Sequence, residues 1–297
     1  MNPNIFHPEI LAQLGTLKLR AQALVDGMTL GEHAGTRRGM SADFLDHQPW
    51  EPGQDPKFID WRAFARTEKF FQKRFQENAN TPVYLLVDYT PEMHYRGERS
   101  PLSKLEYAQC LAAMIGFLAT RQKDSLAAVA FRENAFVPFP LASGESHWQN
   151  QLEFLENPPF TSGEPTQTLK EILTRFVNTF PRRGLVFLFS DWLHWETIAE
   201  TLPVWKQLAA RREEVRLYHL SDPDEQTFPF DQRLRFVGMD GGNSLTTVGT
   251  DVRDAYLYHR NQWCENLQDA LQRLGMEYHA IVTDTPLGES LAATQSR

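Results

Sequence analysis

The sequence predicts an α/β fold: an open, mostly parallel, Rossmann-like sheet with helices on both of its faces. The first observation is a series of short, continuous apolar runs, such as residues 83–87 and 185–190, which is typical of strands buried on both sides. The second is that segments with a helical period, such as residues 104–121, lie between these runs. Strands that alternate with helices pair in parallel through right-handed crossovers, so the two observations together predict the fold class.

Composition and charge narrow the class of protein. The chain has 297 residues, of which 41% are hydrophobic and 23% charged, the proportions of a globular protein with a buried core. Its formal net charge of -8 argues against nucleic acid and anionic membranes as partners, since both attract basic surfaces. Cys110 and Cys264 lie in helical apolar patterns without metal-ligand spacing, and we expect buried free thiols in a reducing compartment.

The N-terminal segment does not have the pattern of a secretory signal. Glu9, Lys18 and Arg20 interrupt its apolar residues, and no small-residue cleavage site follows. The longest nearly apolar run, residues 110–119, is half the ~20 residues that a membrane-spanning helix needs. We therefore expect a cytoplasmic protein without a membrane span.

An amphipathic helix is predicted near the N-terminus. Pro8 opens it, Gly27 helps to end it, and its apolar stripe recurs at intervals of four and three residues: Ile10, Leu14, Leu17, Ala21, Leu24 and Met28. The stripe needs a surface to cover it. Two interpretations stay open: the helix packs on its own domain, or it docks on another protein and mediates oligomerisation.

Residues 30–66 predict a long structured loop, because they are rich in Gly, Pro and charge and keep no period. We expect residues 1–79 to form a helix-and-loop region packed on a main α/β domain of residues 80–297. Two interpretations of the charged loop residues stay open. Asp60 and Arg66 pair to lock the loop onto the sheet, or Arg37 and Arg38 form a cationic edge for an acidic partner surface or a phosphate.

The main domain follows as an ordered series of strands and helices. Strands are predicted at 83–87, 126–131, 185–190, 215–220 and 276–282, with a Pro-containing edge strand at 136–139 and a hairpin at 233–239 and 244–248. Helices are predicted at 104–121, 166–179, 195–211 and 252–274.

Polar side chains gather where the predicted strands end. Asp88, Thr90 and Glu92 follow the first strand, Thr166 stands at a helix start, and Ser190 and Asp191 end a later strand. Ligands of open parallel sheets bind at this carboxyl edge, and oxygen ligands suit Mg²⁺, with Mn²⁺ as a substitute. The alternative is that Asp88 and Asp191 only accept backbone hydrogen bonds in turns while Thr166 caps its helix.

The pattern resembles a known site. Asp88-x-Thr90-x-Glu92, then Gly163-x-x-Thr166, then Ser190-Asp191, is similar to the metal-ion-dependent adhesion site of von Willebrand factor A domains, which reads Asp-x-Ser-x-Ser, Thr, Asp. The preceding segment resembles the opening signature of the family known as domain of unknown function 58, as does Lys104. The signature residues are Gly35-Thr36-Arg37-Arg38-Gly39, Asp43-Phe44, Pro52-Gly53-Gln54-Asp55, Ile59-Asp60-Trp61 and Ala65-Arg66.

The resemblance implies a von Willebrand A-like domain and a non-enzymatic, protein-binding adaptor. Members of the family are encoded beside MoxR-type AAA+ ATPases, which implies such an ATPase as partner, together with unknown protein clients. The implied metal ligands are Asp88, Thr90, Glu92, Thr166 and Asp191.

This sequence departs from the adhesion-site motif at Glu92, where the motif has a second serine. A carboxylate there either binds the ion directly or takes the position of a partner's carboxylate, so the site is degenerate. A second hypothesis uses the same carboxylates differently: Asp88, Glu92 and Asp191 hold cations that activate water in a phosphoesterase or nuclease.

Two further residues are candidates for partner binding beside this edge. Trp192 follows Asp191 directly, and an exposed Trp there would suit an interface, where Trp is an energetic anchor. His194 lies three residues after Asp191 and could reach the same edge. The alternative for both is packing within the domain. No hydrolase, P-loop or dinucleotide motif is present in the sequence.

Overall fold

The computed structural model describes residues 6–34, 44–49, 71–75, 81–161, 166–192, 198–239 and 244–292. Its centre is a six-stranded sheet with strand order β10-β7-β6-β3-β4-β5. All neighbouring strands pair in parallel except β5, which pairs antiparallel with β4 at one edge. The strands are β3 (Pro82–Asp88), β4 (Ser125–Arg132), β5 (Ala135–Ala142), β6 (Leu185–Ser190), β7 (Glu214–Ser221) and β10 (Glu277–Val282).

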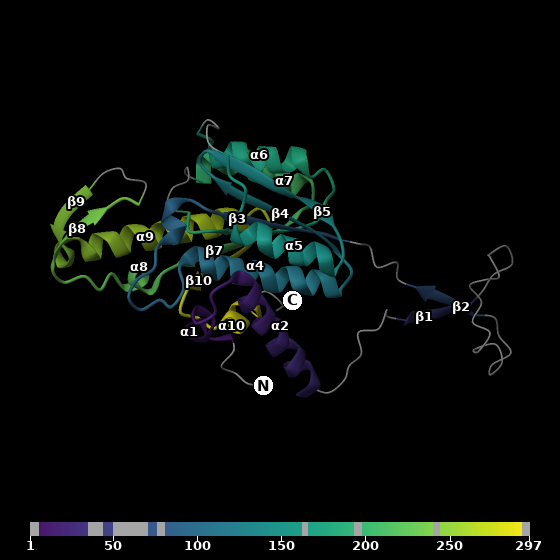
Figure 1. The fold of residues 1–297 in the computed structure, drawn as a ribbon. Coiled ribbons are helices and arrows are strands. Elements are labelled where there is room, and N and C mark those ends of the chain that lie inside the picture. The colour runs from purple at the N-terminus through teal and green to yellow at the C-terminus, as the bar shows by residue number, and fades with distance from the viewer. Residues whose placement is uncertain are drawn as a thin grey trace.

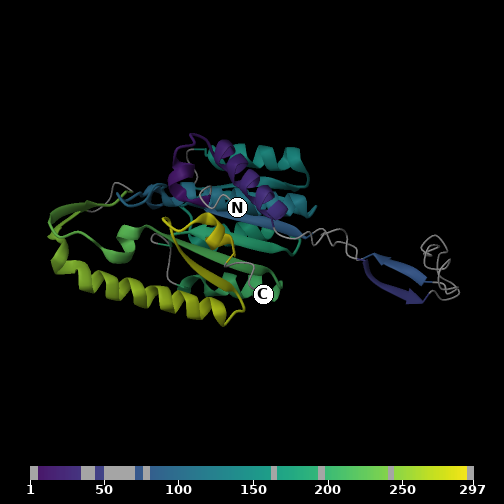
Figure 2. The same ribbon diagram turned by 90° about the horizontal axis from the view of Figure 1, so that it is seen from below.

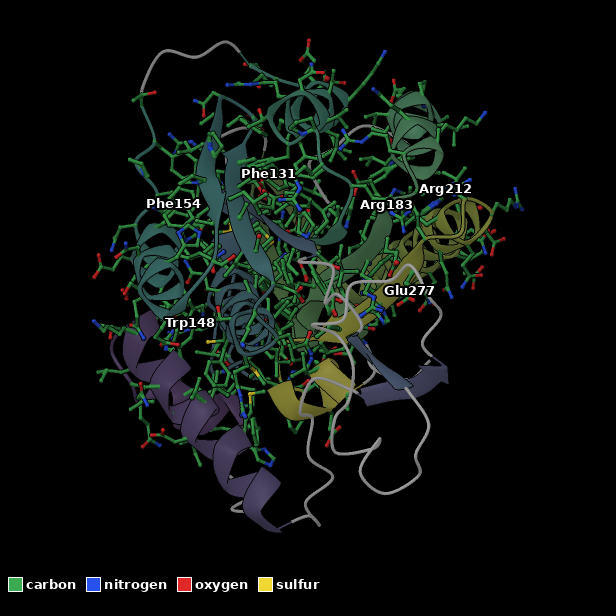
Figure 3. All side chains as sticks on the ribbon, turned by 90° about the vertical axis from the view of Figure 1, so that its right-hand side faces the viewer. Phe131, Trp148, Phe154, Arg183, Arg212 and Glu277 are labelled. Atoms are coloured by element: carbon green, nitrogen blue, oxygen red, sulfur yellow. The ribbon has the colours of Figure 1, made fainter. Side chains whose placement is uncertain are left out.

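Helices cover both faces of this sheet, as Figures 1 and 3 show. One face carries α4 (Lys104–Arg121) and α5 (Glu145–Glu156), with α1 (Pro8–Ala12), α2 (Leu17–Ala34) and α10 (Leu287–Ala292) packed around them. The other face carries α6 (Leu169–Thr179), α7 (Ile198–Ala210) and α9 (Gly249–Gln272). The predicted fold class is confirmed.

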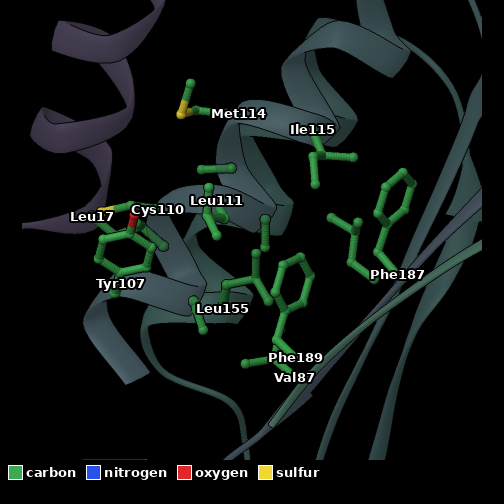
Figure 4. Close-up of a cluster of buried hydrophobic side chains, with 14 of the residues drawn as sticks. Leu17, Val87, Tyr107, Cys110, Leu111, Met114, Ile115, Leu155, Phe187 and Phe189 are labelled. Carbon is green, nitrogen blue, oxygen red and sulfur yellow. The ribbon is translucent and has the colours of Figure 1, made fainter. Parts of the chain in front are cut away.

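The alternation of side chains along β3 explains how one strand serves two cores. Val83, Leu85 and Val87 enter the core beneath α4, whereas Tyr84 and Leu86 enter the core beneath α6 and α7. Successive strand residues point to opposite faces, so a strand buried on both sides needs an unbroken apolar run. Figure 4 shows the first of these cores, where α4 side chains lie between α2 and the strands.

The remaining elements are short or lie beside the sheet. They are η3 (Pro91–His94), α8 (Pro223–Thr227), the antiparallel pair β8 (Arg233–Val237) and β9 (Ser244–Val248), and the antiparallel pair β1 (Phe44–Pro49) and β2 (Phe71–Phe75). The β8–β9 hairpin lies near the start of the long helix α9 (Figure 2). Within the described part of the chain, every helix is too short or too polar to span a bilayer.

The N-terminal helix differs from the prediction in two ways. It is broken into α1 and α2 at residues 13–16, and α2 continues past Gly27 to Ala34. The break is stabilised by Arg20, whose Nε donates to the carbonyl oxygens of Leu11 (3.1 Å) and Leu14 (3.0 Å). A glycine inside a helix costs only about 1 kcal/mol, so Gly27 does not end α2.

The apolar stripe of these helices is covered by the protein's own core. Leu17, Ala21 and Leu24 of the stripe are buried in the cluster that includes α4, and α2 contacts α4 and α5. Leu14 and Met28 are half-buried and pack against the same cluster. The interpretation of internal packing is therefore confirmed for these residues.

The predicted loop at residues 30–66 is partly wrong, because α2 continues to Ala34 and residues 44–49 form the strand β1. The rest of that loop, including Asp60 and Arg66, lies outside the described residues. The boundary between residues 79 and 80 stays a prediction. Both cysteines are free thiols, with Cys110 buried and Cys264 only half-buried.

Replacing Arg20 by methionine is expected to lower the free energy of unfolding by about 2 to 3 kcal/mol. The guanidinium bonds two carbonyls at the α1–α2 break and also Oε1 of Glu106 (2.9 Å), and hydrogen bonds of charged groups contribute about 1.5–3 kcal/mol. Urea denaturation of the wild type and the variant measures the loss. Lys18→Met, an exposed change on the same helix, is the control and should stay within about 0.5 kcal/mol.

Candidate functional site

The sheet has a topological switch point between β3 and β6. From β3 the chain proceeds through β4 and β5 in one direction, and from β6 through β7 and β10 in the other. In open α/β sheets, ligands bind outside the carboxyl ends of the strands at such a point. The residues that follow β3 and β6 are therefore the candidate site.

The ends of these two strands are joined through the Asp88 carboxylate. Its Oδ2 accepts a hydrogen bond from Oγ of Ser190 (2.6 Å), and its Oδ1 accepts one from the backbone N–H of Thr90 (2.8 Å). The backbone N–H of Trp192 in turn donates to Oγ of Ser190 (3.0 Å). Asp88, Thr90 and Ser190 are buried, so this chain of bonds is enclosed. These hydrogen bonds bring the predicted residues Asp88, Thr90 and Ser190 together.

Asp191 is bonded to a cation of the protein itself. Nζ of Lys104, the first residue of α4, donates to Oδ2 of Asp191 (2.7 Å) and to Oε1 of Glu225 in α8 (2.7 Å). The side chains of Lys104 and Asp191 are 0% and 1% exposed, and that of Glu225 is 16% exposed. An ion pair so fully buried is costly to form unless its charges are compensated, and here two carboxylates face the single ammonium.

Helix α8 holds Glu225 in place. Asp222 caps the helix, and its Oδ2 also accepts from the backbone N–H of Gly97 (2.8 Å). Nε of Arg99 donates to Oδ1 of Asp224 (2.8 Å). A Cβ on residue 97 would lie 2.3 Å from Oδ2 of Asp224, so any larger residue there would displace that carboxylate. The loop before α4 is thus clamped to α8.

The electrostatics of this cluster keep Lys104 charged. Burial alone would lower the pKa of Lys104, but the adjacent carboxylates of Asp191 and Glu225 outweigh it and raise the pKa above its usual value. Tyr95 stacks beside this ammonium, 5.7 Å from Nζ to the ring centroid. Burial, together with the carboxylates of α8, raises the pKa of Tyr95 to about 12.

His219 is a buried side chain next to Asp191. Its Nδ1 lies 2.6 Å from the Tyr278 hydroxyl and 3.9 Å from Sγ of Cys264, and its ring is hydrogen-bonded to the backbone of Asp191. Burial, with the positive charge of Arg260 nearby, lowers the pKa of His219 to about 3. The His219 ring is therefore neutral at physiological pH. Burial also raises the pKa of the Cys264 thiol, which disfavours a thiolate.

Three other predicted residues, Thr166, Glu92 and Trp192, lie among the described residues. Thr166 is exposed ahead of α6 and is not its cap, because Thr168 is the N-cap residue. Glu92 is half-buried in η3. Of the two interpretations of Trp192, packing within the domain is the one observed: its side chain is 4% exposed, and its ring centroid lies 5.9 Å from that of Trp205. Arg37, Arg38 and His194 lie outside the described residues.

The backbone at Trp192 is strained. Its φ of 61° places a bulky, non-glycine residue in the left-handed region, directly after the end of β6. Such residues persist only where the surrounding structure fixes them, and they concentrate at functional sites. The indole Nε1 is buried and makes no hydrogen bond within the described residues.

The described donors do not fit the divalent cation of the adhesion-site motif. Mg²⁺ takes an open octahedral set of oxygens, whereas the Asp88 and Asp191 carboxylates are already bonded by Ser190, Thr90 and Lys104. In the part of the chain that the structure describes, no group of three or more His, Cys, Asp or Glu side chains is placed to hold an ion. Metal binding stays a prediction, and the phosphoesterase hypothesis, which needs these carboxylates open, has no support from the described contacts.

Sequence reasoning missed the residues of α8. Asp222, Pro223 and Glu225 form a capping box with proline at the first helical position, a pattern readable from sequence. It predicts a helix start but not the bond from Glu225 to Lys104. Nothing in the sequence pattern singled out His219.

Comparisons with known proteins place the chain among uncharacterised relatives. The family model described as "Protein of unknown function DUF58" matches residues 46–263. "Uncharacterized protein Rv1480" of Mycobacterium tuberculosis and "Uncharacterized protein Mb1516" of Mycobacterium bovis are each 24% identical over 229 residues, covering 76% of this chain and 69% of theirs.

Solved structures with a similar arrangement include two Bacteroides proteins and a VWA domain. Conserved hypothetical protein BatB of Bacteroides thetaiotaomicron has 15% identity and a TM-score of 0.46, covering 72% of this chain and 96% of that one. An aerotolerance-related membrane protein of Bacteroides fragilis has 17% identity and a TM-score of 0.48, covering 72% and 97%. The SpRpn10 VWA domain has 8% identity and a TM-score of 0.42, covering 72% and 94%.

Proposed function

The chain belongs to the family described as Protein of unknown function DUF58, and from this premise we propose that it is a non-enzymatic, protein-binding module. The binding surface is the carboxyl edge of its sheet at the switch point between β3 and β6. The partner is a MoxR-type AAA+ ATPase, through which the module acts on other proteins. Because that partner consumes ATP, the proposal places the protein in the cytoplasm.

One observation carries the proposal: the switch point is held rigidly by bonds of the chain's own residues. Asp88 joins the ends of β3 and β6, and the strained backbone of Trp192 follows at the same place. A strained backbone lowers stability, so it persists only where the surrounding structure holds it, as a buried hydrogen-bond network does. Such strain is typical of functional surfaces that must keep one shape. A preorganised surface reduces the entropy that binding would otherwise lose.

Exposed residues around this edge are the contact candidates. His94 ends η3, Arg96 follows it, and Thr166 precedes α6, and all three side chains are exposed. Arg37 and Arg38, which the sequence suggests as a cationic edge, are candidates for an acidic surface of the same partner.

We expect Arg96→Glu and Thr166→Arg each to weaken binding to the purified MoxR-type ATPase of the same organism at least tenfold. Biolayer interferometry with the full chain immobilised, in the presence of nucleotide, measures the affinity. The matched control is Arg273→Glu, an exposed arginine after α9 and before β10, hence at the opposite edge of the sheet. Arg273→Glu should leave the affinity unchanged.

The same assay separates the parts of the proposal. Equal binding by wild type, Arg96→Glu and Thr166→Arg would mean that the edge is the wrong surface. Absence of binding by wild type would reject the ATPase as partner. Salt-sensitive weakening by the double change Arg37→Glu and Arg38→Glu would assign these arginines to the interface.

A further inference from the structure

Lys104 occupies a position where a lysine needs a specific reason. It is the first residue of α4, and the N-terminus of a helix carries a partial positive charge that repels a cation. Its side chain is also fully buried, which removes the hydration of the ammonium. Both effects disfavour a lysine here unless anions compensate for them.

Two carboxylates supply that compensation at short range. Asp191 Oδ2 and Glu225 Oε1 each lie 2.7 Å from Nζ, the length of charge-assisted hydrogen bonds. Asp191 is the last aspartate of the adhesion-site pattern, and Glu225 comes from α8, which is itself clamped to the loop of Gly97 and Arg99. The ammonium therefore links α4, β6 and α8.

A second cation at Asp191 would meet this ammonium. Like charges separated by a few ångströms in a buried site repel strongly, because the low dielectric screens them little. The other carboxylate of the motif, Asp88, is engaged by the Ser190 hydroxyl and the Thr90 N–H. The ammonium of Lys104 therefore already supplies the positive charge at the Asp191 carboxylate.

We infer that the ammonium of Lys104 is the resident cation of this sheet edge, in the position where the adhesion-site motif uses a divalent metal, so that recognition at the edge is independent of divalent cations. This inference rests on the proposed function for its biological consequence. Its chemical content, the occupancy of the edge by Lys104, is independent of any partner.

The experiment is calorimetric titration of Mg²⁺ and Mn²⁺, to millimolar concentration, into the metal-stripped full chain. Wild type is expected to bind neither ion saturably. Saturable binding by wild type that Thr90→Val abolishes would overturn the inference, since it would assign the ion to the motif. Thr90→Val is the suitable probe because Oγ1 of Thr90 makes no hydrogen bond within the described residues, so its loss should be tolerated.

A second measurement uses Lys104→Met, which leaves Asp191 and Glu225 facing one another. In the folded variant, Mn²⁺ is expected to raise the Tm by several degrees, a rise that wild type lacks, since a ligand that binds only the folded state stabilises it. An equal rise in both proteins would overturn the inference. If the variant does not fold, the wild-type titration decides alone. Neither measurement includes a partner protein. A failure of the proposed function would therefore appear only in the binding assay with the ATPase, and a failure of this inference only in the metal measurements.

Discussion

Lys104→Met is expected to lower the free energy of unfolding by about 3 to 5 kcal/mol, the usual cost of removing one partner from a buried ion pair. The variant leaves the buried carboxylate of Asp191, and that of Glu225 beside it, without the ammonium that lies 2.7 Å from each. Urea denaturation measures the loss, with Lys206→Met, an exposed lysine on α7, as the matched control.

A compensated variant tests the cause of that loss. Adding Asp191→Asn and Glu225→Gln to Lys104→Met removes the buried negative charge, and we expect it to recover part of the lost stability. A loss in Lys104→Met as small as that in Lys206→Met would contradict the buried ion cluster. A loss that the triple variant fails to reduce would assign the effect to packing rather than to charge.

Stability is expected to fall as the pH drops below about 6.5 because of His219. In the folded protein the pKa of His219 is lowered to about 3, whereas in the unfolded chain it is about 6.5. Between these values the unfolded state binds one proton more than the folded state, so acid favours unfolding, and above pH 6.5 the contribution is constant. Between pH 7 and pH 5 the loss from this residue is about 2 kcal/mol.

The charged groups around His219 do not reverse this sign. Burial is the largest cause of the lowered pKa, Arg260 and Lys104 lower it further, and Asp191 raises it by less. Tyr278 and Cys264 face Nδ1 as neutral groups, since the pKa of each is raised. Protonation would therefore place a positive charge among a buried hydroxyl, a thiol and two cations.

The check is to measure the free energy of unfolding at pH 5 and pH 7 for wild type and His219→Gln. We expect the variant to be less stable at pH 7 and to lose about 2 kcal/mol less than wild type between the two pH values. His259→Gln, an exposed histidine on α9, is the control and should follow wild type. An unchanged difference between pH 5 and pH 7 in His219→Gln would contradict the assignment.

The sequence located many of the elements because their signals are local. The predicted helix at residues 104–121 and strand at 185–190 agree with α4 and β6 to the residue. In α4 a complete capping box fixes the start, with Ser103 and Glu106 bonding each other's backbone. In β6 the apolar run is too short for a typical helix, and its length is typical of a strand with both faces covered.

Other elements were missed although their residues carry a signal. In α5, Trp148, Leu152 and Leu155 are spaced by four and three residues and are buried, but Gly144 begins the helix without a side-chain cap. The N-terminal stripe keeps its period across the break between α1 and α2, so periodicity alone predicts one helix. The break depends on Arg20 bonding Leu11 and Leu14, a contact between two helices.

The fold class and the convergence of Asp88, Ser190 and Asp191 follow from the sequence pattern, because parallel strands bring their carboxyl ends to one edge of the sheet. What those side chains bind depends instead on contacts between elements that are far apart in the chain. Lys104 lies 87 residues from Asp191 and 121 from Glu225 in the sequence, and their bonds depend on how α4 and α8 are placed over the sheet. The hydrophobic pattern of a helix or strand repeats within a few residues, so it can be recognised locally in the sequence. An ion pair depends on how distant elements are placed in the fold, so the sequence pattern does not reveal it.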